Sequence, residues 1–132
     1  MVDVRSVFRD YLDLKFTSDE LSRRLGPPWR FQREGENYLL EPGDIDFDPI
    51  CVEALAVERA IGSALRGDVS LDELQDWANL ILLFDGYEVA SSLAFHSVES
   101  LQSVLHTLAS PAIYGSLTPE RLTKLRKEIA EN

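Results

Sequence analysis

The sequence predicts a mainly α fold, a compact bundle of five or six helices with a small β-hairpin near residues 29–41. Two observations predict this class. Apolar residues recur at helical spacing through most of the chain, and capping residues, glycines and prolines divide it into segments of helix length. The 132 residues, of which 45% are hydrophobic and 27% charged, fit a single domain over 1–132 with its own core.

An amphipathic helix is predicted over about residues 3–15, and a second over about residues 17–26. Thr17 with Glu20 three residues later is a capping-box pattern at the start of the second helix. Gly26 suits its end, because glycine tolerates the left-handed conformation there. The apolar stripe of the first helix comprises Val4, Val7, Phe8, Tyr11 and Leu12.

The predicted hairpin rests on alternation and a turn signal. Trp29 and Phe31 alternate with polar residues, residues 33–37 supply the turn, and residues 38–40 form the returning strand. Trp29 lies beside two prolines and is expected to be exposed. We interpret it as an interface anchor, because tryptophan is enriched at binding hot spots.

A central helix is expected over about residues 48–66. Asp48 suits its N-cap and Pro49 its first position, where the missing N–H has no helical partner. Apolar residues cover most of its circumference, which is typical of a buried helix. Cys51 is therefore expected to be a poorly reactive thiol in apolar surroundings.

The C-terminal half is expected to be helical. Ser70 and Glu73 form a second capping box. Residues 87–95 fit either a helix or a loop, and the sequence leaves this open. The predicted helices span about residues 70–84, about residues 98–108 and the segment from residue 118 onward.

Three alternating aspartates, Asp44, Asp46 and Asp48, resemble the start of a calcium loop. Such a loop needs glycine at position 6 and glutamate at position 12, where this chain has Pro49 and Leu55. We therefore expect no metal site here and no cofactor.

No catalytic residues are predicted. His96 and His106 would lie about 15 Å apart along one helix, and no Cys or His pair has zinc-ligand spacing. The seven glycines are scattered singly, so no phosphate-binding loop is visible. We expect a protein that is not an enzyme.

The negative charge is concentrated in one third of the chain. Residues 34–76 hold 12 acidic and two basic residues, which equals the net charge of −10 of the whole chain. Such a segment repels nucleic acid and anionic membranes and favours basic protein partners. The alternative is that the acidic surface only maintains solubility.

The sequence predicts a cytoplasmic location. No apolar run approaches the roughly 20 residues that cross a bilayer. No basic start followed by an apolar block marks a secretory signal, and the single cysteine suits a reducing compartment.

Three segments carry a resemblance to a known family: residues 64–73 (ALRGDVSLDE), 76–78 (DWA) and 105–120. With them, residues 54–132 resemble small bacterial toxin-immunity proteins of the helical, colicin-D-immunity-like kind. The resemblance implies a protein that binds a cognate toxin and blocks it, often by laying an acidic surface against a basic nuclease active site.

These observations predict an acidic binding protein that neutralises a basic protein partner, with a toxin nuclease domain as the leading candidate. The alternative is a helical adaptor or regulatory interaction module without a toxin partner. Whether the acidic residues form one contiguous patch is left open, because a long helix separates them. The predicted partner-binding residues are Asp44, Asp46, Asp48, Asp72, Glu73, Asp76 and Trp29.

Overall fold

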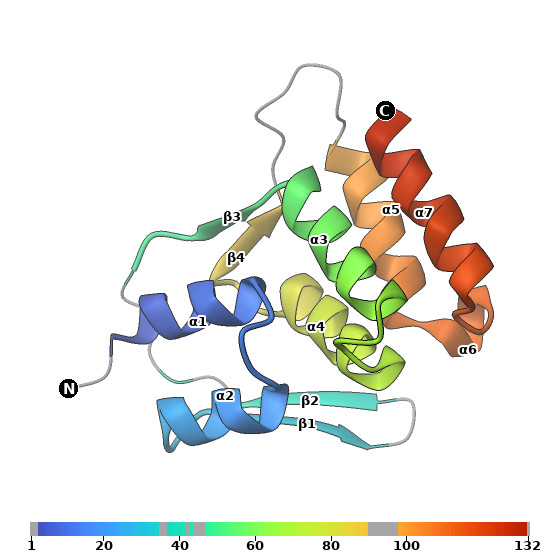
Figure 1. Cartoon of the computed structure of the whole chain (residues 1–132). Helices are drawn as coiled ribbons and strands as arrows, with labels where there is room; N and C mark the ends of the chain where they lie inside the picture. The colour runs from blue at the N-terminus through green and yellow to red at the C-terminus, as the bar shows by residue number, and fades with distance from the viewer. Residues whose placement is uncertain (1–2, 35–36, 42, 44–46, 90–97, 132) are drawn as a thin grey trace.

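Figure 1 shows the fold as a computed structural model, which describes residues 3–34, 37–41, 43, 47–89 and 98–131. The mainly α class and the hairpin are confirmed. The helices are α1 (Val4–Leu12), α2 (Ser18–Leu25), α3 (Ala54–Leu65), α4 (Leu71–Leu83), α5 (Val98–Ala109), α6 (Pro111–Tyr114) and α7 (Pro119–Glu131). The strands are β1 (Arg30–Glu34), β2 (Asn37–Glu41), β3 (Ile50–Val52) and β4 (Tyr87–Val89).

Local capping signals fix the starts of α2 and α4. The Thr17 hydroxyl accepts a hydrogen bond from the Glu20 N–H at 3.4 Å, and the Ser70 hydroxyl accepts one from the Glu73 N–H at 3.1 Å. Each bond satisfies one of the backbone donors that have no partner inside the helix. Gly26, with a φ of 71°, ends α2 as expected.

The helices α3 and α4 lie at the centre of the molecule (Figure 1). On one side of them are α1, α2 and the β1–β2 hairpin; on the other, α7 packs against α3 and α5 packs against α4. The α4–α5 contact includes two amide donors: Gln75 Nε2 and Asn79 Nδ2 reach the Ala109 carbonyl at 3.4 and 3.2 Å. Buried apolar side chains from both sides belong to one hydrophobic cluster.

The predicted start of the central helix is wrong. Residues 50–52 form β3, which pairs in parallel with β4, and α3 begins only at Ala54. Ile50 and Val52 are buried while Cys51 between them is exposed, which is the two-residue period of a strand. The long-range partner overrides the local helix signal, because β4 supplies the backbone hydrogen bonds that a helical turn would otherwise supply.

The pairing of β3 with β4 also corrects the predictions for Cys51 and for residues 87–95. The Cys51 thiol is exposed on β3 and does not lie inside an apolar helix. Tyr87–Val89 is a strand, which the choice between helix and loop did not include. The rest of that segment lies outside the described residues.

An aromatic cluster surrounds Phe8 of α1. Its ring contacts those of Trp29 at 5.1 Å and Phe84 at 4.4 Å between centroids, and it also meets Phe31, Phe47 and Tyr87. The expectation that Trp29 is exposed is therefore wrong, since only 8% of it is accessible. Trp29 immediately precedes β1, and the alternation with Phe31 that predicted the strand agrees with the burial of both rings.

Candidate functional site

The N-terminal end of α4 carries the acidic side chains that the sequence singled out there. Asp72 and Glu73 occupy the first turn, where negative charge is favourable to the helix dipole. Asp76 follows one turn later and is a surface neighbour of both. Asp72 is exposed, whereas Glu73 and Asp76 are half-buried.

Glu73 contacts two other helices. Its Oε1 accepts hydrogen bonds from the Ser18 backbone N–H at 2.7 Å and from the Tyr11 hydroxyl at 3.3 Å. Its Oε2 accepts one from the Ser18 hydroxyl at 3.4 Å. Ser18 is the first residue of α2, so the carboxylate sits at a helix N-terminus, where anions are stabilised. Glu73 therefore joins α4 to α1 and α2.

The environment of Glu73 changes its acidity. Burial raises the pKa of the Glu73 carboxyl, and the nearby charge of Asp76 raises it further. The hydrogen bonds from Ser18 and Tyr11 act in the opposite direction and only partly offset the burial. Glu73 is thus a half-buried carboxylate whose hydrogen bonds join three helices, and it differs in this from an exposed surface charge.

A pocket of about 420 Å³ opens beside Glu73. It lies between the α1–α2 connection and the α3–α4 connection. Leu14, on its rim, has a φ of 55°, in the left-handed region that residues other than glycine rarely adopt. The volume lies within the range of small-ligand sites. The lining residues are Leu14, Lys15, Phe16, Thr17, Asp68, Val69, Ser70 and Glu73.

Asp48 lies in a different place. It is exposed, and its backbone carbonyl accepts a hydrogen bond from Arg5 Nε at 3.4 Å, near the start of α1. Glu73 contacts Tyr11 near the end of the same helix. The helix α3, about 18 Å long, runs from the β3 end of the molecule to the start of α4 (Figure 1). Asp48 therefore does not join the acidic end of α4.

The remaining predicted site residues divide into two groups. Asp44 and Asp46 lie outside the described residues. Trp29 is part of the core and is not available as an interface anchor. The acidic residues that the structure does bring together are those of the α4 start, with Asp68 on the preceding connection.

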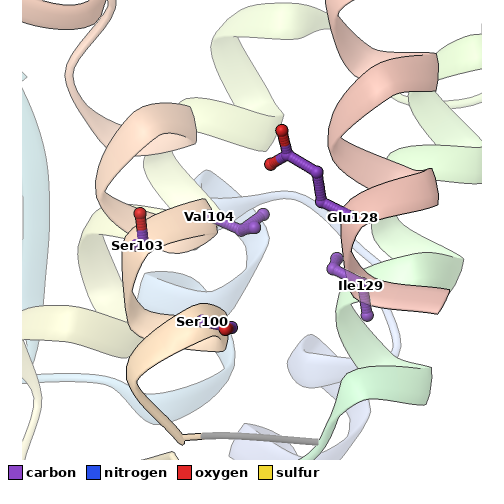
Figure 2. A pocket seen from close by; sticks show the side chains of 5 residues that line it. All are labelled: Ser100, Ser103, Val104, Glu128 and Ile129. Carbon is purple, nitrogen blue, oxygen red and sulfur yellow. The ribbon is translucent and has the colours of Figure 1, made fainter. Parts of the chain in front are cut away.

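Two further pockets lie elsewhere in the described part of the chain. One, of about 380 Å³, is lined by Arg5 and Arg9 together with Cys51, and carries two acidic and two basic side chains. Figure 2 shows the other, where Ser100 and Ser103 of α5 lie across from Glu128 of α7. Its volume of about 130 Å³ is below the range of ligand pockets. Neither contains a residue of the predicted site.

Sequence reasoning missed the pocket beside Glu73. Its apolar walls come from two loops, at residues 14–16 and at Val69, which no periodic pattern marks. The capping-box signal correctly found Ser70 and Glu73, but it assigned the Glu73 side chain to its own helix. The carboxylate instead crosses to Ser18, a tertiary contact without a local signature.

Two further findings concern the described part of the chain. It contains no group of three or more His, Cys, Asp or Glu side chains placed to hold a metal ion. None of the helices within it is long and apolar enough to cross a membrane.

Comparison with protein-family models, with curated proteins and with solved structures found no match to this chain.

Proposed function

We propose that this protein acts in the cytoplasm by binding and neutralising a basic protein partner, and that the partner is a toxin nuclease domain. The observation that carries the proposal is the acidic end of α4, defined as Asp68, Asp72, Glu73 and Asp76. The stretch of sequence between Arg66 and Arg121, which holds all four of these residues, contains no lysine or arginine.

Nuclease chemistry explains why acidity suits this role. A nuclease must attract the phosphate backbone, so its active site presents lysine and arginine side chains. An acidic surface competes for the same side chains and covers them. Exposed charges such as Asp68 and Asp72 also accelerate encounter, because the long-range field steers a basic partner toward them.

The resemblance to immunity proteins supports the same region. Two of its three segments, residues 64–73 and 76–78, include all four residues of the acidic end of α4. A helical adaptor without a toxin partner is the competing proposal, and it assigns no specific role to this surface.

The test is binding to a basic nuclease domain encoded next to this gene, measured by surface plasmon resonance at low and high salt. The variant Asp68→Lys/Asp72→Lys reverses two exposed charges of the acidic end of α4. We expect its association rate to fall at least tenfold at low salt, since steering contributes roughly 10 to 1,000-fold. Salt should slow the wild type far more than the variant.

The matched control is Asp85→Lys/Glu99→Lys. It makes the same change in charge at two exposed residues away from the acidic end of α4. Asp85 lies just after the C-terminal end of α4, and Glu99 lies in the first turn of α5. Equal association rates for the two variants would mean that the acidic end of α4 only maintains solubility. A nuclease that stays fully active in the presence of excess protein would also contradict the proposal.

A further inference from the structure

The pocket beside Glu73 combines apolar walls with one half-buried carboxylate. Leu14 and Phe16 are partly buried and pack against the core, and Val69 faces them from the other connection. Glu73 lines the same pocket, and its carboxylate accepts a hydrogen bond from the Ser18 N–H of α2. Long cationic side chains suit such a site, because their methylene stems bury against apolar surface while the charged group meets an acid.

The charges that line the pocket leave a negative balance. Lys15 is paired with Asp10 at 3.2 Å, and Asp68 is paired with Arg66 at 3.1 Å, both in exposed positions. Glu73 has no lysine or arginine partner within the described residues. It is therefore the one lining carboxylate whose charge a partner's cation can neutralise directly.

The Glu73 carboxylate also has acceptor capacity to spare. An ionised carboxylate offers about four acceptor positions. Oε1 uses two of them for the Ser18 N–H and the Tyr11 hydroxyl, whereas Oε2, among the residues that the structure describes, accepts only the longer contact from the Ser18 hydroxyl. A charged donor that reaches Oε2 would form a short, charge-assisted hydrogen bond and replace part of the lost hydration.

We propose that this pocket receives a lysine or arginine side chain of the basic partner, with its stem between Leu14, Phe16 and Val69 and its cationic group on Glu73 Oε2. The inference depends on the proposed function for the identity of the occupant. It adds a defined docking point to the steering charges of Asp68 and Asp72. Those charges set the rate of encounter, and the pocket sets how long the complex lasts.

The pocket can be tested without a partner. n-Butylguanidinium and n-butylamine reproduce the two side chains, and n-butanol is the neutral control. In a ¹H–¹⁵N NMR titration we expect saturable shifts at the Ser18 amide and at residues 14–17 and 68–73. The dissociation constant should be on the order of millimolar for so small a ligand.

Two variants separate the pocket from general surface charge. Glu73→Gln removes the charge but keeps a carbonyl oxygen that can accept the Ser18 N–H, and its amide spectrum and melting curve show whether the fold is kept. Asp85→Asn removes one exposed charge just beyond the other end of α4. We expect Glu73→Gln to weaken binding of the two cations at least tenfold, and Asp85→Asn to leave it within twofold. The inference is wrong if both variants weaken binding equally, if n-butanol saturates the same amides, or if no saturable shift occurs.

The same variants distinguish this inference from the proposed function when a partner nuclease is used. Glu73→Gln should raise the dissociation rate at least tenfold, whereas Asp68→Lys/Asp72→Lys should lower the association rate. If Glu73→Gln dissociates from the nuclease at the wild-type rate while the charge-reversed variant associates slowly, the pocket is overturned and the proposed function is left intact. Saturable binding of n-butylguanidinium without any binding of the nuclease would reject the proposed function alone.

Discussion

The Glu73 carboxylate and the Ser18 backbone N–H are joined by a 2.7 Å hydrogen bond across 55 positions of sequence. Ser18 begins α2, so its N–H is one of the donors that a helix cannot satisfy internally. An acidic residue of one helix thus caps another. Trp77, one turn further along α4, donates a hydrogen bond from Nε1 to the Leu12 carbonyl at 3.1 Å. This second bond joins α4 to the end of α1.

Removing the Glu73 side chain should destabilise the fold. Glu73→Ala leaves the Ser18 N–H and the Tyr11 hydroxyl without this acceptor in a half-buried position, which typically costs about 1–3 kcal/mol. Urea unfolding at neutral pH measures the change in the free energy of unfolding. The matched variant Asp85→Ala, at an exposed position just beyond the other end of α4, should stay within about 0.5 kcal/mol of the wild type. Equal losses would show that the contact with α2 contributes nothing.

The raised pKa of Glu73 predicts the sign of a pH dependence. Because the folded state holds this proton more tightly than the unfolded chain, the stabilisation is present below the ordinary carboxylate pKa. It is lost as the pH rises through the raised pKa and stays constant above it. The stability of the wild type relative to Glu73→Gln should therefore fall as the pH is raised from about 4, near the ordinary pKa of glutamate, toward neutrality.

Denaturant unfolding across this pH range measures that difference, and a difference that increases with pH would contradict the assignment. Comparison with Glu73→Gln removes the contributions of neighbouring groups that are common to both proteins. The titratable groups around Glu73 are Tyr11 of α1, Lys15 and Asp68 of the two connections, and Asp72 and Asp76 of α4.

Trp29 should behave as a core residue. Its ring packs against Phe8 and Phe84, and a Cβ added at Gly43 would come within 2.6 Å of its Nε1. Trp29→Ala should cost about 3–5 kcal/mol, the usual range for removal of a large buried aromatic ring. Thermal and urea unfolding measure the loss. A variant as stable as the wild type, with full binding lost, would instead indicate an interface anchor.

Gly43→Ala tests the same packing from the other side. The added methyl group has no room against the Trp29 indole, so we expect a loss of about 1–3 kcal/mol through overpacking. Gly67→Ala is a useful comparison, because nothing lies within 4 Å of a Cβ there and its φ of 81° makes the strain purely a backbone effect. In the variant Trp29→Phe, whose smaller ring leaves space, Gly43→Ala should lose most of its effect. Additive losses would mean that the two residues do not pack together.

Cys51 should react readily with thiol reagents in the native state. Its side chain is exposed on β3, and the neighbouring Ile50 and Val52 are the buried members of the strand. Labelling with 5,5′-dithiobis(2-nitrobenzoate) should be only a few-fold slower in native protein than in denaturant, and Cys51→Ser should remove the signal. Protection of 100-fold or more would show that the thiol is covered.

The sequence predicted the elements whose signals are local. Thr17 and Ser70 cap the helices that the capping boxes indicated, and the alternation of Trp29 with Phe31 found the hairpin. β3 was missed because three residues are too short for a period to emerge, and only pairing with Tyr87–Val89 defines it. The helix predicted to start at Asp48 and Pro49 was therefore wrongly taken to include residues 50–52, which form β3.

The candidate site was predictable only in its charge. The acidic residues at the start of α4 are visible in the sequence, and Asp48 is visible as another acidic residue. Their separation from Asp48 depends on where α3 places the two ends, and the role of Glu73 depends on Ser18, on another helix. The sequence shows which residues are charged, but tertiary contacts decide which groups those charges meet.

The aromatic cluster has a consequence for synthesis on the ribosome. Phe8 is among the first residues made, yet Phe84 and Tyr87 of its cluster follow more than 70 positions later, and the Tyr87 hydroxyl donates to the Phe8 carbonyl. At roughly 5–20 residues per second, α1 waits several seconds for these partners to emerge. During that interval the apolar face of α1 lacks these partners and is open to chaperones.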